Sequence, residues 1–144
     1  MACSPTPLGA SRDALSLAAA EWDVLITSGG VSVGDRDYLK QAIRELGELH
    51  LWKLKMQPGK PLAFGSIAGK PWIGLPGNPA AALVTALVVA RPFLWRAQGR
   101  STADTLPVML PAGFDWPTAN PRRQYLRARL ELDSTGVARI CLHP

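Results

Sequence analysis

One stretch of the sequence, from Asp23 to Asp37, limits the possible fold more than any other. It opens with the apolar run Val24-Leu25-Ile26, which is typical of a strand buried on both faces. The loop that follows holds three glycines and two hydroxyl side chains, which are Gly29, Gly30, Gly34, Ser28 and Ser32. A strand, a glycine-rich loop and then a helix predict a site for an anion, because small residues let backbone N–H groups approach a phosphate.

Two carboxylates, Asp35 and Asp37, close this loop where a helical pattern begins. Carboxylates repel a phosphate unless a cation lies between them. The economical interpretation is a phosphate-bearing ligand bridged by a hard divalent metal, and magnesium is the expected one. The structural alternative is that the two aspartates cap the following helix.

Composition narrows the class of protein. The chain has 144 residues, is 47% hydrophobic and 19% charged, and carries a formal net charge of +5. These values fit a folded domain with part of a second one. The basic residues form no concentrated run with interleaved aromatics, so no nucleic-acid partner is expected, and the basic excess suits an anionic small molecule.

Cellular location is also constrained by the sequence. Cys3 and Cys141 lie at opposite ends without a second cysteine nearby, which indicates neither a zinc site nor a disulfide framework. The first ten residues lack the features of a signal peptide. The most apolar run, Ala80–Ala90, is shorter than the about 20 residues that span a bilayer. We therefore expect a cytoplasmic protein without a membrane partner.

The pattern of residues 11–99 predicts alternating helices and strands. Helices are expected over Arg12–Glu21, Arg36–Leu46 and Ala80–Ala90, with Ser11, Asp35 and Asn78 as caps, Gly47 ending the second helix and Pro92 interrupting the third. Strands are expected over Asp23–Thr27, Leu49–Met56, Leu62–Gly65 and Pro71–Leu75, with a turn at Ser66–Lys70 between the last two. This order predicts an α/β fold with a mainly parallel sheet and flanking helices.

After Gly99 the frequent prolines exclude long helices. Gln124–Leu132 alternates in polarity and would form a hairpin with Val137–Leu142 around the turn at Asp133–Gly136. We expect three parts: residues 1–10 without structure, an α/β domain over 11–99, and the start of a small antiparallel β domain over 100–144.

Four motifs in order resemble one known family. They are Ser28–Asp37, Trp52-Lys53, Pro58-Gly59-Lys60-Pro61 and Leu75-Pro76-Gly77-Asn78-Pro79. Together they resemble molybdopterin molybdenumtransferases, the enzymes that insert molybdate during molybdenum-cofactor synthesis and that include the E domain of gephyrin. The resemblance covers about Asp23 to Gly99. More loosely, Arg122, Tyr125 and Arg127 resemble the entry to the family's C-terminal β domain.

The resemblance implies a reaction and a set of site residues. Enzymes of this family take adenylylated molybdopterin and molybdate, cleave the adenylate with magnesium, and leave molybdenum on the dithiolene. Asp37, with Asp35, would hold Mg²⁺ against the pyrophosphate, and Asp37, Lys53 and Lys60 would be the catalytic residues. The other substrate-binding residues would be Gly29, Gly30, Ser32, Gly34, Pro76, Gly77, Asn78, Pro79 and Arg122.

Departures from the family pattern set the remaining expectations. Gln57 stands where many members carry a lysine. An upstream glycine-containing loop and two N-terminal domains are missing, so we expect a fragment that is inactive alone and homodimeric when full length. Lys53, Lys60 and Arg122 could instead be solvated surface residues, and Leu75–Pro79 could matter only for shape. The chain could also be a non-catalytic molybdopterin-binding or partner-binding scaffold, or an unrelated nucleotide-binding domain.

Overall fold

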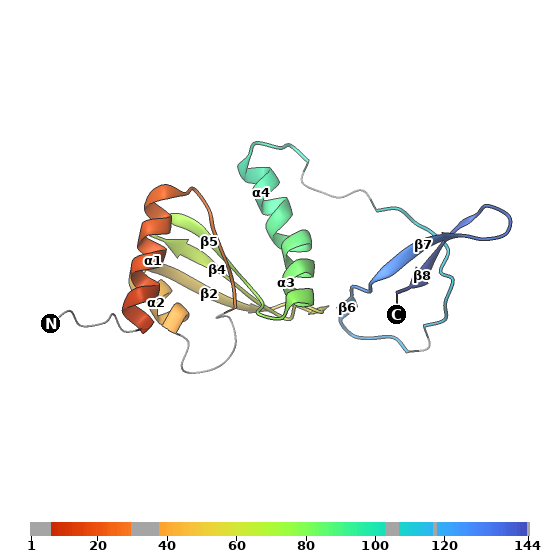
Figure 1. Ribbon diagram of the computed structural model, residues 1–144, viewed down its shortest axis with the longest axis horizontal. Helices are drawn as coiled ribbons and strands as arrows, with labels where there is room; N and C mark the ends of the chain where they lie inside the picture. Colours follow the sequence, from red (N-terminus) through yellow and green to blue (C-terminus); the bar gives the residue numbers. More distant parts are fainter. Residues whose placement is uncertain (1–6, 30–37, 103–106, 117, 144) are drawn as a thin grey trace.

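The computed structural model describes residues 7–29, 38–102, 107–116 and 118–143. Figure 1 shows a sheet with helices on both faces and a hairpin set apart from it at the C-terminal end. The helices are α1 (Pro7–Glu21), α2 (Tyr38–Leu46), α3 (Pro79–Thr85) and α4 (Arg91–Ala97), with a π-helical turn η1 (Ala86–Ala90) between the last two. The strands are β1 (Leu25–Ser28), β2 (Gly47–Lys53), β3 (Met56–Gln57), β4 (Pro61–Ile67), β5 (Lys70–Leu75), β6 (Arg123–Gln124), β7 (Ala128–Leu132) and β8 (Ala138–Leu142).

The main sheet has the strand order β1-β5-β4-β2. The α/β class with flanking helices and a small antiparallel sheet is confirmed. The main sheet is mixed rather than mainly parallel, since β1 pairs parallel with β5 while β5–β4 and β4–β2 are antiparallel. The reason is the tight turn between β4 and β5, where Ala68 and Gly69 have φ values of 48° and 77°. A two-residue turn with both φ angles positive joins neighbouring antiparallel strands and leaves no room for a crossover helix.

The strand directions bring four chain segments to one end of the sheet. Strands β1, β5 and β2 run the same way, and β4 runs against them. In the register of the sheet, Ser28 lies beside Leu75, and Lys53 lies beside Pro61. We call this end, where β1, β2 and β5 finish and β4 starts, the carboxyl end. Ligands of open α/β sheets bind beyond such an end.

Apolar side chains cover both faces of the sheet. On the side of α1 and α2, the buried cluster consists of Leu15, Ala19, Leu25, Ala42, Ile43, Ala63, Ile67 and Trp72. Towards α3 and α4 a smaller cluster consists of Leu62, Ile73, Leu75 and Ala90. Neighbouring residues of a strand point to opposite faces, which is why Trp72 and Ile73 belong to different clusters. The Nε1–H of Trp72 donates a hydrogen bond to Oγ1 of Thr27 over 3.2 Å, which ties β5 to β1.

Two expectations about the N-terminal half are wrong. Helix α1 starts at Pro7 rather than Arg12, because proline is well placed in a first helical turn. Ser11 does not cap this helix; its Oγ donates to the carbonyl of Pro7 within it. Helix α2 does end at Leu46, directly before Gly47 as expected, but Gly47 is also the first residue of β2. A Cβ there would lie 2.2 Å from the carbonyl oxygen of Ser66, so the glycine serves close strand approach.

The expectations for the third helix are confirmed at its start. Asn78 is the N-cap, its Oδ1 accepts from the N–H of Ala81 over 3.1 Å, and Pro79 is the first helical residue. The interruption at Pro92 takes the form of the π-helical turn that precedes it. Proline lacks an N–H and clashes with the carbonyl of an ideal preceding turn, which a wider turn relieves.

The joined helical segment Pro79–Ala97 is longer than the expected apolar run. Its 19 residues are long and apolar enough to cross a membrane by length and composition alone. One such segment carries little weight, because a helix that packs on a sheet can pass the same test. Here Ala81, Thr85 and Ala90 are buried, whereas Leu83 and Leu87 are 61% and 43% exposed.

The C-terminal segment differs from the expected continuous strand. Residues 123–132 divide into β6, which pairs parallel with β3, and β7, which pairs antiparallel with β8.

The hairpin turn between β7 and β8 is at the predicted place. Asp133 accepts hydrogen bonds from the hydroxyl and N–H of Thr135 and the N–H of Val137, and these bonds lower the pKa of Asp133. On β8, a hydrogen bond to Glu131 raises the pKa of Cys141, so this thiol stays protonated at neutral pH.

Candidate functional site

At the carboxyl end, the loops that follow β1 and β5 lie against each other. The N–H of Gly29 donates to the carbonyl of Leu75 over 3.0 Å, and the Ser28 hydroxyl donates to the carbonyl of Pro76 over 3.3 Å. A Cβ built on Gly77 would lie 3.5 Å from the Cα of Gly29. The backbones of the two loops therefore lie close together at Gly29 and Gly77, with no side chain of either residue between them.

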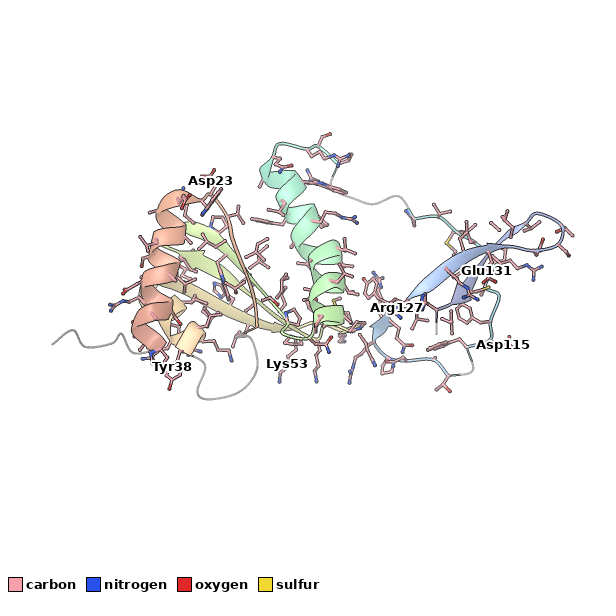
Figure 2. The ribbon with its side chains drawn as sticks, in the orientation of Figure 1. Asp23, Tyr38, Lys53, Asp115, Arg127 and Glu131 are labelled. Atoms are coloured by element: carbon pink, nitrogen blue, oxygen red, sulfur yellow. The ribbon has the colours of Figure 1, made fainter. Side chains whose placement is uncertain are left out.

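Two lysines lie at the other side of the same end, on β2 and just before β4. Lys53 ends β2 and pairs in register with Pro61, the neighbour of Lys60. The carbonyl of Lys60 accepts from the N–H of Leu54 over 2.7 Å, so the two segments are locked together. Both lysine side chains are exposed, and Figure 2 shows Lys53 at the end of the sheet near the base of α3. Two strand spacings, about 10 Å, separate β5 from β2, a span that suits an extended anion.

The C-terminal segment brings arginines to this end through the β3–β6 pairing. The N–H of Arg123 donates to the carbonyl of Lys55 over 2.9 Å, and the N–H of Tyr125 donates to the carbonyl of Gln57 over 2.8 Å. Arg122 is exposed and directly precedes this pairing. The structure therefore places Arg122 next to the segment that carries Lys53 and Lys60.

In the segments that the structure describes, the carboxyl end carries charge of one sign. The described segments that form it (residues 28–29, 53–61, 75–79 and 122–125) contain no aspartate or glutamate. Within the part of the chain that the structure describes, Lys53, Lys60 and Arg122 form no ion pair. Exposed cations without carboxylate partners attract an anionic ligand and raise its association rate.

Several predicted site residues lie outside the described residues: Gly30, Ser32, Gly34, Asp35 and Asp37. Of the others, Gly29, Pro76 and Gly77 meet at the carboxyl end, and Pro76 is buried while Gly77 is exposed. Asn78 and Pro79 follow in the second loop and start α3, so part of their role is structural. The residues that the structure describes contain no group of three potential metal ligands.

Sequence reasoning missed two contributors. Arg123 joins the carboxyl end through a strand pairing between segments far apart in the chain, for which no local signal exists. Thr85 packs beneath the Pro58–Pro61 turn, where a Cβ built on Gly59 would lie 2.6 Å from its Oγ1. The Pro-Gly pair in the sequence could have predicted a turn in which Gly59 has a positive φ, and the structure has a φ of 108° there.

An apolar hollow elsewhere in the described part of the chain is unsuited to an anion. It lies between the sheet and the helical segment, has a volume of about 220 Å³, and is lined by Leu62, Phe64, Gly65, Pro71, Trp72, Ile73, Val89 and Phe93. These side chains offer no charge. The candidate site is therefore the carboxyl end and not this hollow.

Comparison with known proteins follows the same segments. Residues 8–96 match the family described as "Probable molybdopterin binding domain". The chain is 43% identical over 83 residues to a molybdopterin molybdenumtransferase of Haemophilus influenzae, which covers 58% of this chain and 20% of that protein. It is 37% identical over 127 residues to molybdopterin molybdenumtransferase 2 of Mycobacterium tuberculosis, covering 78% of this chain and 29% of that protein.

A solved structure agrees in fold. The molybdopterin biosynthesis moea protein from Pyrococcus horikosii superposes with a TM-score of 0.65 at 30% sequence identity. The match covers 92% of this chain and 31% of that chain. This chain thus spans between a fifth and a third of the length of these relatives.

Proposed function

The chain belongs to the molybdopterin-binding domain family of molybdenum cofactor biosynthesis, and on this premise we propose that its carboxyl end binds the anionic part of adenylylated molybdopterin. The observation that carries the proposal is the gathering of Lys53, Lys60 and Arg122 beside two glycine loops, without a carboxylate in the described segments. The pyrophosphate of the ligand is the group with most negative charge. It would lie across the end of the sheet, between the loops and the lysines.

Each side of this end supplies a different kind of contact. Gly29 and Gly77 place no side chain between the two loops, and main-chain N–H groups other than that of Gly29, which donates to Leu75, would donate to phosphate oxygens. Lys53 and Lys60 would offset the charge of the pyrophosphate and of molybdate. Gln57, where many members have a lysine, is exposed near this end and adds no charge. Arg122 and Arg123 supply positive charge near Gln57.

Magnesium would need other residues. The described segments of the carboxyl end hold cationic and neutral side chains but no carboxylate, so they do not fit a hard cation that prefers charged oxygen ligands. We therefore assign Mg²⁺ to Asp35 and Asp37, on the sequence alone. When bound there, the metal would neutralise charge on the pyrophosphate.

The reaction that we propose for the complete protein is molybdate insertion with cleavage of the adenylate. In it, Lys53 and Lys60 would stabilise the charge that develops on the departing phosphate. We also propose that the full-length protein is a cytoplasmic homodimer and that this chain alone has no turnover. The second candidate is a scaffold that binds molybdopterin without chemistry, which the limited coverage of the relatives keeps open.

The test is a calorimetric titration of the chain with adenylylated molybdopterin in the presence of Mg²⁺. We expect binding that weakens as salt is raised, because exposed charges are screened. Molybdate added to the complete protein should release AMP if it is an enzyme, whereas a scaffold would retain the nucleotide. A chain that binds neither adenylylated molybdopterin nor pyrophosphate at low salt would contradict the proposed function.

Asp37→Ala tests the assignment of the metal. If Asp37 holds Mg²⁺, the variant should lose the part of the binding that depends on magnesium, while its circular dichroism and melting temperature stay those of the wild type. Asp23→Ala is the matched control, since Asp23 pairs with Lys70 at the opposite end of the sheet. Loss of stability with unchanged magnesium dependence would favour the helix-capping alternative.

A further inference from the structure

Thr85, the last residue of α3, has a hydroxyl that its environment does not explain. Its side chain is fully buried. Among the described residues, its Oγ1 has no hydrogen-bond partner. A buried hydroxyl without a partner costs stability, and an aliphatic side chain of the same shape would avoid that cost. Stability therefore does not explain why a hydroxyl-bearing side chain occupies this position.

The geometry around Oγ1 of Thr85 suggests a role in placing the neighbouring turn. Gly59 lies directly above it with φ of 108°, and a Cβ at this position would lie 2.6 Å from Oγ1 and 3.0 Å from Cε of Met56. The Cα hydrogen that takes the place of this Cβ therefore points at the oxygen, in the manner of a weak C–H···O contact. An oxygen is smaller than a methyl group, so it lets the turn settle closer to α3.

This contact bears on the site through the next residue. Lys60 follows Gly59, and its carbonyl is held from the other side by the N–H of Leu54 over 2.7 Å. The turn is thus held between β2 and α3. Gly59 is buried and Lys60 is exposed, so the support lies beneath the turn and the charge above it.

We propose that Thr85 is a positioning residue for Lys60. Its hydroxyl oxygen sets how closely Gly59 approaches α3, and thereby where the Lys60 ammonium lies at the carboxyl end. This assignment rests on the proposed function for its effect on binding, but the position of the turn can be measured without a ligand.

The experiment compares Thr85→Val with Thr85→Ser in the full chain. Valine keeps the branched shape and replaces the oxygen by a methyl group, whereas serine keeps the oxygen and loses the methyl group. With inorganic pyrophosphate as the probe, we expect the serine variant to bind like the wild type. The valine variant should bind pyrophosphate more weakly. The loss of one exposed charge contact weakens binding by about fivefold, and this is the largest effect that we expect.

Stability should rank the two variants in the opposite order. Serine loses a buried methyl group, and valine removes an unpaired hydroxyl, so the valine variant should melt at the higher temperature. A purely structural role of Thr85 would make binding follow stability. In a Lys60→Met background, the effect of valine on binding should disappear, because Thr85 acts through Lys60.

Amide chemical shifts of the free protein separate the two proposals. The Gly59 and Lys60 amide signals should move in Thr85→Val and stay in Thr85→Ser. If they do so while the wild type binds no pyrophosphate, the proposed function fails and the positioning role stands. Unmoved signals in Thr85→Val, or a valine variant that binds as tightly as the wild type, would overturn the role of Thr85.

Discussion

The double variant Lys53→Glu, Lys60→Glu is expected to bind pyrophosphate about 100-fold more weakly than the wild type, because two exposed attractions of up to about 1 kcal/mol each become repulsions. Both side chains are exposed and lie at the carboxyl end, so their reversal should leave the fold intact. Titration calorimetry with pyrophosphate at low salt measures the change. At high salt the difference in affinity between the double variant and the wild type should become smaller, because exposed charges are screened.

A control with the same change in net charge is Arg12→Glu, Lys70→Glu. Arg12 lies on α1, and Lys70 starts β5 at the opposite end of the sheet. This control should bind pyrophosphate within about threefold of the wild type, since only long-range, screened charge is altered. Equal losses in the two double variants would mean that pyrophosphate responds to overall charge and that the carboxyl end is not a site.

Trp72→Ala should remove about 3–5 kcal/mol from the free energy of unfolding, enough to unfold a marginally stable domain at room temperature. Trp72 is 1% exposed, belongs to the cluster beneath α1 and α2, and ties β5 to β1 through Thr27. Its loss leaves a cavity at the centre of the sheet and frees the strand that carries the second loop. Urea unfolding followed by circular dichroism measures the effect.

Trp22→Ala is the matched control, because Trp22 is 59% exposed and follows the end of α1. We expect a change within about 0.5 kcal/mol for an exposed side chain. If Trp72→Ala unfolded at the same urea concentration as Trp22→Ala, the description of Trp72 as a buried core residue between the sheet and the helices α1 and α2 would be wrong.

Local signals in the sequence predicted local structure well. Asn78 and Pro79 provide a cap and a first helical residue within two positions, and both occur where expected. The stripe of α2 that packs on the core was readable from its period, with Ala42 and Ile43 both fully buried. Such features depend on a few neighbouring residues, which a single sequence contains.

Features that depend on distant segments were not predictable. The parallel pairing of Met56–Gln57 with Arg123–Gln124 has no local signature, although it brings Arg122 and Arg123 to the site. The mixed sheet follows from the turn at Ala68–Gly69, where alanine adopts a positive φ that its chemistry disfavours. Gly47 follows the end of α2 as predicted, but its second role, the close approach to Ser66 on β4, depends on a strand neighbour across the sheet that local sequence does not show.

The candidate site shows the same division. The four motifs identified the loops and the lysines, and the resemblance that they carried is confirmed for residues 8–96. That Gly29 meets Gly77, and that Lys60 shares the carboxyl end with Lys53, follows from the register of the sheet. The roles of all the predicted site residues, Lys53 and Lys60 as well as Asp35 and Asp37, stay predictions.

The most direct test of the central claim is a map of where adenylylated molybdopterin binds, from amide chemical shifts of the labelled chain titrated in the presence of Mg²⁺. The proposed site predicts the largest changes at Gly29, Lys60 and Gly77, around the carboxyl end, with Ala68 and Gly69 at the opposite end unchanged. Changes centred on Ala68 and Gly69, or on the apolar hollow beside Phe93, with the carboxyl end unaffected, would contradict the account.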